Sequence, residues 1–252
     1  MSAPPGISIK ELTKRYGDVV GLDHLDLDLP SGGIVGLMGD NGAGKTTLLK
    51  ILAGVLADWT GQVDVFGHRP GPETKAFTSF LPDADFLPDR YRVNDALALY
   101  QDFFADFDTA RARALLDGFD LPLGRSLKEY SKGMREKLQI ALTMSRRARV
   151  FLLDEPISGV DPASRSIIME NILANYDAEA LLVMSTHLIA DIEPVADHVV
   201  FLKAGRVLLQ GRADDLRQTN GLSIDKLFRK VYREGVPDNT WTPSASGDGS
   251  EA

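Results

Sequence analysis

Hydrophobic and polar positions follow two strand-like patterns in this chain. Residues 7–12 and 25–29 alternate apolar and polar side chains, which is the period of half-buried strands, and they predict antiparallel strands at a sheet edge. Residues 34–38, 150–153 and 180–185 form nearly continuous apolar runs. Such runs are typical of strands that a parallel sheet buries on both faces. The pattern therefore predicts a mainly parallel sheet with an antiparallel part.

Between about residues 91 and 147 the apolar positions change to a helical period. They recur every three or four positions along the first predicted helix. The apolar residues of that helix are Ala96, Leu99, Phe103 and Phe107. Asp108 then has the place of an N-cap for a helix over residues 109–117, which Gly118 closes.

The strand pattern returns after this helical segment. A helix is expected over residues 164–176, between two of the apolar runs. Residues 199–202 and 207–209 flank the turn at 203–206 and predict a hairpin of two edge strands. A last helix is predicted over residues 223–232.

Length and composition fit one large domain. The chain has 252 residues, of which 44% are hydrophobic, enough for an α/β domain with a substantial core. Residues 237–252 contain few apolar side chains and predict a disordered tail. The expected organisation is one domain over residues 1–236, with a helical subdomain inserted at about residues 90–147, followed by the tail.

Charge and residue usage exclude several classes of protein. The net charge of −8 argues against a general nucleic-acid binder. Arg146, Arg147 and Arg149 lie at the end of a predicted helix, where cations complement the helix dipole. The chain has no cysteine, which excludes disulfides and fits a reducing compartment. No secretion signal is expected, and the apolar runs are far shorter than the ~20 residues of a membrane span, so a membrane connection would require a partner.

A glycine-rich segment at residues 39–47 carries the strongest chemical signal. Its sequence, G-D-N-G-A-G-K-T-T, fits G-x-x-x-x-G-K-[ST] between a predicted strand and a predicted helix. Glycines let backbone N–H groups turn toward a phosphate, and the helix start adds its positive dipole end. Lys45 would reach the terminal phosphates, and the Thr46 hydroxyl would hold Mg²⁺. The expected nucleotide-binding residues of this loop are Gly39, Asn41, Gly42, Ala43, Gly44, Lys45, Thr46 and Thr47.

Two carboxylates follow the apolar run at residues 150–153 and give it the form of a Walker B strand. Parallel α/β sheets bind ligands at the carboxyl ends of their strands. Asp154 would orient Mg²⁺ through its water shell, and Glu155 would act as general base on the attacking water. Taken alone, an acidic pair after a strand is more often a solvated loop start.

Two further segments are ambiguous from local sequence. Ser131, before a predicted helix, is an ordinary N-cap or part of an anion site at the helix start. His187, at the end of a predicted strand, is more often structural when it stands alone.

The order and spacing of all these segments resemble the ABC (ATP-binding cassette) ATPase family over roughly residues 7–232. The matching positions are Tyr16 for the adenine-stacking aromatic, residues 39–47 for Walker A, residues 130–134 for the signature motif with Ser131 and Gly133, Asp154 and Glu155 for Walker B, residues 158–161 for the D-loop with Asp161, and His187 for the switch histidine. The resemblance implies a P-loop NTPase (RecA-like) α/β core with a mainly parallel sheet, an N-terminal antiparallel β subdomain and an inserted α-helical subdomain.

Two departures from the family pattern stand out. Asp83 occupies the position of the usual glutamine that contacts Mg²⁺ and the attacking water, and we expect it to keep a metal-linked role. The signature is Tyr-Ser-Lys-Gly-Met at residues 130–134, with Lys132 in place of a glycine. This signature is similar to that of ATPases of bacterial ABC-2-type exporters. The Leu-Pro-Asp sequence at residues 81–83 and the aromatic-rich helix after it resemble the Ytr and peptide-antibiotic-resistance kind within that group.

The resemblance also implies partners and a mechanism. Two ATPase subunits would bind ATP and Mg²⁺ head to tail, with Ser131, Gly133 and Asp161 of one subunit facing the phosphate loop of the other. Glu155 would act as base, with Lys45 and His187 on the γ-phosphate. The membrane partner would be an ABC-2-type transmembrane permease, with the chain on the cytoplasmic face of the membrane and no nucleic-acid partner.

The resemblance leaves alternatives open. A soluble ABC ATPase without a transport role, such as an accessory protein of iron–sulfur cluster assembly, is the alternative function, although the signature favours export. The second ATPase subunit is either another copy or a different chain. The transported substrate cannot be predicted, because its specificity would lie in the membrane subunit.

Overall fold

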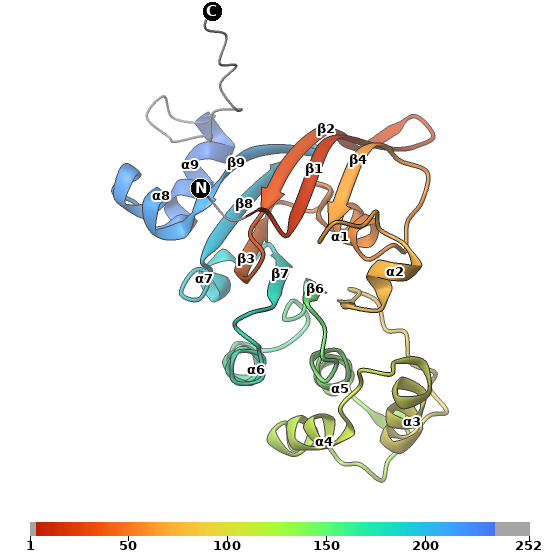
Figure 1. Ribbon diagram of the computed structural model, residues 1–252. Coiled ribbons are helices and arrows are strands. Elements are labelled where there is room, and N and C mark those ends of the chain that lie inside the picture. Colours follow the sequence, from red (N-terminus) through yellow and green to blue (C-terminus); the bar gives the residue numbers. More distant parts are fainter. Residues whose placement is uncertain (1–3, 235–252) are drawn as a thin grey trace, which may run out of the picture.

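Two β-sheets and a set of helices make up residues 4–234, the part of the chain that this computed structural model describes (Figure 1). The strands are β1 (Ile7–Tyr16), β2 (Val19–Leu29), β3 (Gly33–Met38), β4 (Thr60–Val65), β5 (Thr78–Leu81), β6 (Val150–Asp154), β7 (Leu181–Thr186), β8 (His198–Lys203) and β9 (Arg206–Arg212). The helices are α1 (Lys45–Leu52), α2 (Pro72–Lys75), α3 (Val93–Phe103), α4 (Thr109–Gly118), the 3₁₀ helix η1 (Leu127–Glu129), α5 (Lys132–Met144), α6 (Pro162–Ala174), α7 (Ile189–Ile192), α8 (Ala213–Asn220) and α9 (Ile224–Glu234). The predicted tail at residues 237–252 lies outside the described residues.

The first two strands are antiparallel, as predicted, but their predicted place at a sheet edge is wrong for β1. They form a separate three-stranded sheet in the order β2-β1-β4. β1 lies in its centre because Ile7 pairs with Leu29 of β2 on one side and with Val65 of β4 on the other.

The second sheet has six strands in the order β5-β6-β7-β3-β8-β9. Its first five strands are parallel, and β9 is antiparallel to β8. The predicted hairpin is present, and Ala204 and Gly205 in its turn have positive φ angles of 48° and 77°, as a tight two-residue hairpin turn requires. Its description as two edge strands is wrong, because β8 also pairs with β3.

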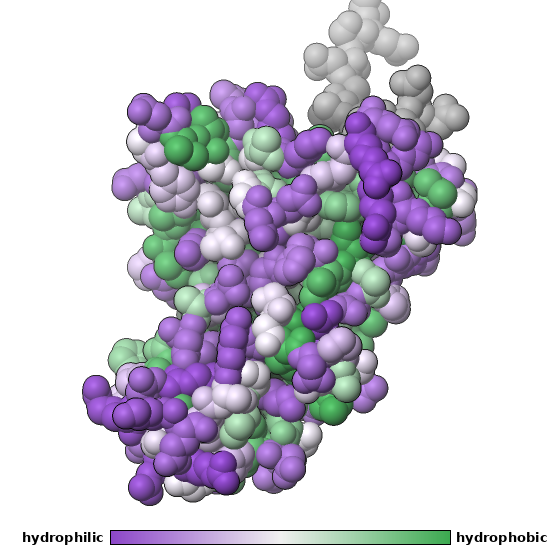
Figure 2. Space-filling model, turned by 180° about the vertical axis from the view of Figure 1, so that it is seen from behind, coloured by the Kyte–Doolittle hydropathy of each residue, from purple (hydrophilic) through white to green (hydrophobic). Residues whose placement is uncertain are grey.

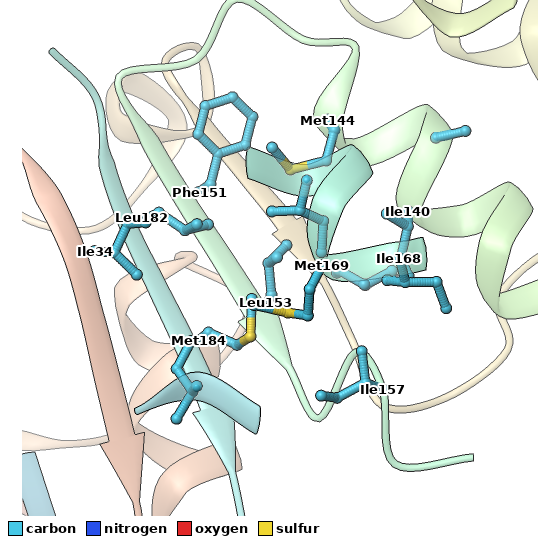
Figure 3. Close-up of a cluster of buried hydrophobic side chains, with 14 of the residues drawn as sticks. Ile34, Ile140, Met144, Phe151, Leu153, Ile157, Ile168, Met169, Leu182 and Met184 are labelled. Carbon is cyan, nitrogen blue, oxygen red and sulfur yellow. The ribbon is translucent and has the colours of Figure 1, made fainter. Parts of the chain in front are cut away.

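The apolar strands of this sheet bury both of their faces. Successive side chains along a strand point to opposite faces, so β6 and β7 contribute to two separate cores. Phe151, Leu153, Leu182 and Met184 pack with residues of α5 and α6, including Ile140, Met144, Ile168 and Met169 (Figure 3). Val150, Leu152, Leu181 and Val183 pack on the other face with α1 and the three-stranded sheet. The sheet is thus held rigidly between two layers, with its strand ends free for a site.

Helices α3, α4 and α5 lie below the sheets in Figure 1 and form the helical segment that the sequence predicts. Asp108 caps α4 as predicted, since its carboxylate accepts the Arg111 N–H at 3.0 Å. The predicted apolar face of the first helix is confirmed for Ala96 and wrong for Phe103. The buried residues of α3 are Val93, Ala96, Leu97 and Tyr100, whereas the Phe103 side chain is 74% exposed. Phe107 lies beyond the helix end, because the backbone turns extended at Phe104.

The three arginines after α5 have other roles than the helix dipole. Arg146 is buried, pairs with Asp106 at 3.0 Å and donates to the carbonyl of Thr78 at 2.6 Å. Arg149 stacks on the Phe66 ring at 4.1 Å. The helix-dipole explanation is therefore wrong for these two residues, since they connect α5 and β6 to the neighbouring elements.

The surface carries mainly hydrophilic side chains on the face seen in Figure 2, with smaller hydrophobic areas between them. The large apolar side chains that are exposed are Tyr16, Val19, Val20, Val55, Phe86, Phe103 and Ile167. Within residues 4–234, the model has no helix that is both long and apolar enough to cross a membrane.

Candidate functional site

The strand order brings three predicted segments to one edge of the six-stranded sheet. β3, β7 and β6 are neighbours and parallel, so their carboxyl ends lie side by side (Figure 1). In register, Met38 pairs with Thr186 of β7, and Asp154 of β6 pairs with Ser185. The phosphate loop, the acidic pair and His187 follow directly after these positions. Ligands of parallel α/β proteins bind at such an edge.

The phosphate loop connects β3 to α1 with the backbone that its glycines permit. Gly42 and Gly44 have φ angles of 82° and 108°, which other residues rarely adopt. A Cβ atom at Gly44 would lie 2.8 Å from the carbonyl oxygen of Gly21, so the three-stranded sheet also requires glycine there. Asn41 and Gly42 are exposed at the loop tip, whereas Ala43 is buried. The free N–H groups of α1 start at this loop, as an anion site requires.

Lys45 lies at the centre of the site. Its side chain is buried, and its Nζ donates to the carbonyls of Gly39 at 2.6 Å and Asp40 at 3.3 Å. The same Nζ lies 3.1 Å from the Glu155 Oε1 atom. Lys45 therefore pairs with Glu155 and also binds the backbone of its own loop.

The two carboxylates of the acidic pair have different partners. Asp154 is buried, and its Oδ1 accepts the Ser185 hydroxyl at 2.6 Å. The Glu155 backbone turns to a positive φ of 50°, and its N–H donates to the Ser185 hydroxyl at 3.0 Å. The Glu155 Oε2 lies 2.8 Å from Nδ1 of His187. One carboxylate is thus fixed in the sheet, and the other joins Lys45 to the histidine.

Sequence reasoning gave no role to Ser185, although it holds both acidic residues. It is fully buried in a strand whose preceding residues are apolar. A hydroxyl at the buried end of such a strand needs a polar partner, which is the signal that the sequence offers for Ser185.

Asp83 follows β5 and faces the same group of carboxylates. It lines a hollow together with Asp154 and Glu155. Partial burial, and then the negative charges of Asp154 and Glu155, raise the pKa of the Asp83 carboxyl, while Lys132 and His187 oppose that shift. Three carboxylates close together repel one another, and a bound cation would relieve this repulsion.

The site fits Mg²⁺ by its donor set. The Asp154 Oδ2 atom is buried and has no hydrogen-bond partner, so it is free to accept a cation or its water. Thr46 in the first turn of α1 supplies a hydroxyl, and Asp83 a further carboxylate. Mg²⁺ takes hard oxygen ligands of these kinds.

Tyr16 ends β1 close to the start of α1. Its hydroxyl lies 3.3 Å from the Thr47 hydroxyl, and about half of its side chain is exposed. A Cβ atom at Gly21 would lie 2.9 Å from the Tyr16 ring, so β2 packs against one face of it. The ring is thus fixed beside the phosphate loop with surface left for a ligand.

Ser131, Gly133 and Asp161 form a second group. Ser131 caps α5 by accepting the Met134 N–H at 3.3 Å, and Asp161 caps α6 by accepting the Ser164 N–H at 3.1 Å. Contacts from the Ser164 side chain and backbone lower the pKa of Asp161. A Cβ at Gly133 would lie 3.3 Å from Val160, so the two helix starts are adjacent. Among residues 4–234, no hydrogen bond or ion pair joins these three residues to the phosphate loop.

The residues of the site therefore fall into two parts, of which the first has the loop geometry that binds a nucleoside phosphate. The phosphate loop, the carboxylates and His187 form the first part. The α5 and α6 starts form the second part, and Lys132 at the start of α5 lines the same hollow as Asp83, Asp154 and Glu155.

Known proteins resemble this chain in sequence and architecture. The model of the family described as ABC transporter matches residues 22–158. The chain is 32% identical to the daunorubicin resistance ATP-binding protein DrrA3 of Streptomyces coeruleorubidus, over 93% of this chain and 77% of that protein. It is 28% identical to the Nod factor export ATP-binding protein I of Cupriavidus metallidurans, over 83% of this chain and 72% of that protein. A solved structure of an ATP-binding subunit of an ABC transporter superposes with a TM-score of 0.78 at 28% identity, over 90% of this chain and 99% of the other.

Proposed function

The chain belongs to the ABC transporter family as an ATP-binding ATPase, and from this premise we propose that it energises export through a bacterial ABC-2-type exporter. Two relatives are named for daunorubicin resistance and for Nod factor export, which supports a transporter ATPase over the soluble, non-transport alternative. The Ser-Lys-Gly-Met signature at residues 131–134 further supports the ABC-2 type.

One observation carries the catalytic part of the proposal. Glu155 lies between Lys45 and His187, 3.1 Å and 2.8 Å away, beside the buried Asp154 at the ends of neighbouring strands. A general base must lie near the attacking water and be oriented by a further group. We assign Glu155 as the base that takes the proton of the water, with His187 orienting its carboxylate and then contacting the γ-phosphate.

Binding of ATP would rearrange the resting contacts of Lys45. Its ammonium would leave Glu155 and the Gly39 carbonyl for the terminal phosphates, which frees the Glu155 carboxylate to act as base. The N–H groups of the loop and of Thr46 and Thr47 would hold the other phosphate oxygens. Tyr16, fixed beside Thr47, would stack on the adenine ring.

Thr46, Asp154 and Asp83 would hold Mg²⁺ in this site. The bound cation would neutralise the negative charge that develops on the transferring phosphoryl group. Ser185 would keep the Asp154 carboxylate oriented, because its hydroxyl already donates to Oδ1.

The second group of residues supports a dimer. Ser131, Gly133 and Asp161 have no hydrogen bond or ion pair to the phosphate loop within residues 4–234, so we propose that they complete the site of a second ATPase subunit. ATP held between two subunits would link nucleotide binding to dimer closure.

We infer that residues 1–236 act as one ATPase domain, with the helical subdomain at about residues 90–147. The membrane partner would be an ABC-2-type permease, which places the chain at the cytoplasmic face of the membrane. The half-exposed Phe86 lies in the segment between β5 and the helical subdomain and is a reasonable contact for that partner.

The proposal is tested with the variant Glu155→Gln, which keeps the shape of the side chain and removes its basicity. We expect turnover to fall at least about 100-fold, within the range that a general base contributes, while ATP binding persists. Affinity capture of this variant with ATP from detergent-solubilised membranes should then recover a polytopic membrane protein, identified by mass spectrometry.

The matched control is Glu179→Gln, which changes an exposed glutamate before β7 and should leave turnover unchanged. Unchanged turnover in Glu155→Gln would contradict the assignment of the base. Recovery of soluble partners alone would contradict the transport function and favour the non-transport class.

A further inference from the structure

Tyr232 lies on α9, outside the sequence motifs described above, and its side chain contacts the phosphate loop. Its hydroxyl accepts the backbone N–H of Asp40 at 3.2 Å, the second residue of the loop. The same hydroxyl donates to the carbonyl of Leu202 in β8. One phenol therefore connects α9, the strand beside β3 and the start of the loop.

The surroundings of Gly39 show that this contact is tight. A Cβ atom at Gly39 would lie 2.6 Å from the Leu202 oxygen and 3.1 Å from the Tyr232 hydroxyl. The first peptide of the loop thus lies directly against both the Leu202 carbonyl of β8 and the phenol hydroxyl. Any displacement of the phenol would change the space in which this peptide is held.

The Tyr232 side chain is itself held firmly. Its ring stacks with Phe228 at 4.1 Å, and Phe228 packs edge-on against Phe201 of β8 at 5.1 Å. Lys203 donates to the Tyr232 carbonyl at 2.8 Å. Burial raises the pKa of Tyr232 to about 12, so the hydroxyl keeps its proton for Leu202 at neutral pH.

We propose that Tyr232 is a positioning residue of the nucleotide site, which holds the Gly39–Asp40 peptide in the geometry that binds phosphate. The inference rests on the proposed role of this loop in binding ATP. The Lys45 Nζ donates to the Gly39 carbonyl of this peptide at 2.6 Å and to the carbonyl of the next peptide, that of Asp40, at 3.3 Å. When Lys45 leaves these carbonyls for a phosphate, the contact from Tyr232 remains to hold the peptide in place.

The loop binds phosphates through its backbone, so its order before binding determines the affinity. A loop that is held in the bound geometry loses less conformational entropy when the nucleotide binds. Removing the hydroxyl would leave the Asp40 N–H and the Leu202 carbonyl without this partner while keeping the ring stack. Nucleotide affinity should then fall although no group that touches the nucleotide has changed.

The chain offers a matched control at the start of β3, the strand that leads into the phosphate loop. The Tyr176 hydroxyl accepts the Gly33 N–H at 3.0 Å and donates to the Ala180 carbonyl at 2.6 Å. Tyr176 thus makes the same pair of contacts at the first residue of β3, about 20 Å of extended strand away from the loop. Tyr176→Phe loses a similar pair of hydrogen bonds far from the phosphates, and the Gly33 N–H keeps the Ala180 carbonyl as a partner at 3.1 Å.

The experiment measures dissociation constants of Mg·ATP and Mg·ADP by titration calorimetry for the wild-type chain, Tyr232→Phe and Tyr176→Phe. We expect Tyr232→Phe to bind both nucleotides about 3- to 10-fold more weakly, as the loss of a neutral hydrogen bond predicts. In Tyr232→Phe, KM should rise, whereas kcat should stay within twofold of the wild-type value. Hydrogen–deuterium exchange of the loop peptide should be faster than in the wild-type chain. Tyr176→Phe should lower the melting temperature comparably and leave both dissociation constants within twofold.

Equal affinities of Tyr232→Phe and wild type would overturn the inference, and so would an equal loss in Tyr176→Phe, which would indicate general destabilisation. A wild-type chain that binds no ATP would instead overturn the proposed nucleotide site, and with it this inference. The wild-type titration therefore distinguishes the two failures.

Discussion

Glu155 shows how a single residue is prepared for its proposed chemistry. Its φ of 50° lies in the left-handed region, which costs a residue with a Cβ atom of the order of 1 kcal/mol or more. Ser185 stabilises this turn, because its hydroxyl and its carbonyl both accept the Glu155 N–H, at 3.0 Å and 3.2 Å. The turn directs the Glu155 side chain to Lys45 and His187 while Asp154 stays in the sheet.

Asp83 carries the first prediction at this scale. Its carboxyl lies beside Asp154 and Glu155, and their charges contribute to its raised pKa. If Asp83 contributes to the Mg²⁺ site, Asp83→Ala should lower the rate of ATP hydrolysis about tenfold and raise the Mg²⁺ concentration needed for half-maximal activity, since residues that support a metal typically contribute 10- to 100-fold. A Mg²⁺ titration of the steady-state rate measures both effects.

Asp102→Ala, at an exposed position of α3, is the control and should leave both quantities unchanged. If Asp83→Ala kept the wild-type rate and the wild-type Mg²⁺ dependence, Asp83 would have no metal-linked role.

The residues of the candidate site were largely predictable, because each belongs to a short motif with its own chemistry. The glycine-rich loop predicted the place of Lys45 and Thr46, and the structure brings Glu155 to Lys45 and His187 to Glu155. Ser185 and Tyr232 were not found from the sequence. Their contacts depend on the pairing of β6 with β7 and of α9 with β8, and no local pattern encodes such pairing.

At the scale of elements, the strands were predicted better than the helices of the insert. Buried strands have an unambiguous apolar run, whereas the period around α3 fits more than one helical face. The predicted face included Phe103 and Phe107, but the helix ends at Phe103 and buries Tyr100 instead, which packs with Phe104 and Phe107 at 5.2 Å and 5.4 Å. α8 was not predicted because its sequence, A-D-D-L-R-Q-T-N, has almost no apolar period.

Arg146 connects several elements and carries a prediction on stability. It is 3% exposed and pairs with Asp106, and it donates to carbonyls of Thr78 in β5 and of Lys75 and Ala76 before it. Arg146→Met would remove this partner from the largely buried carbonyls and from Asp106, whose side chain is 23% exposed. We expect the free energy of unfolding to fall by about 3–5 kcal/mol, measured by urea denaturation.

Arg147 offers the control for this prediction, because it makes an ion pair of similar length on the surface. It lies 3.0 Å from Asp108 with 75% of its side chain exposed. Arg147→Met should cost less than about 1 kcal/mol. Similar losses for the two variants would mean that the buried network contributes no more than a surface pair.

At the scale of the whole molecule, the strand order of the six-stranded sheet explains why residues far apart in sequence lie together in one site. β7 lies between β3 and β6, so the phosphate loop, Asp154 and His187 converge at one edge. The general architecture, a parallel sheet with an antiparallel sheet and a helical insert, was predictable from the apolar pattern and the family resemblance. The separate sheet of β1, β2 and β4 was predicted only through the resemblance, because pairing between distant strands is not visible in local periodicity.

The division of the site between two parts of the molecule leads to the last prediction. Lys45 lies in the first part and Ser131 in the second, so a head-to-tail dimer would contain two sites, each with Lys45 of one chain and Ser131 of the other.

Lys45→Ala and Ser131→Arg should each abolish ATP hydrolysis when present alone. A mixed dimer of the two variants would have one doubly altered site and one site with neither change. Mixing equal amounts should therefore restore up to about a quarter of the wild-type rate, because half of the dimers are mixed and each has one intact site of two. Steady-state ATPase assays of the separate and mixed variants measure this. Ser131→Arg with full activity alone, or a mixture no more active than its components, would show that the two parts do not complement each other between chains.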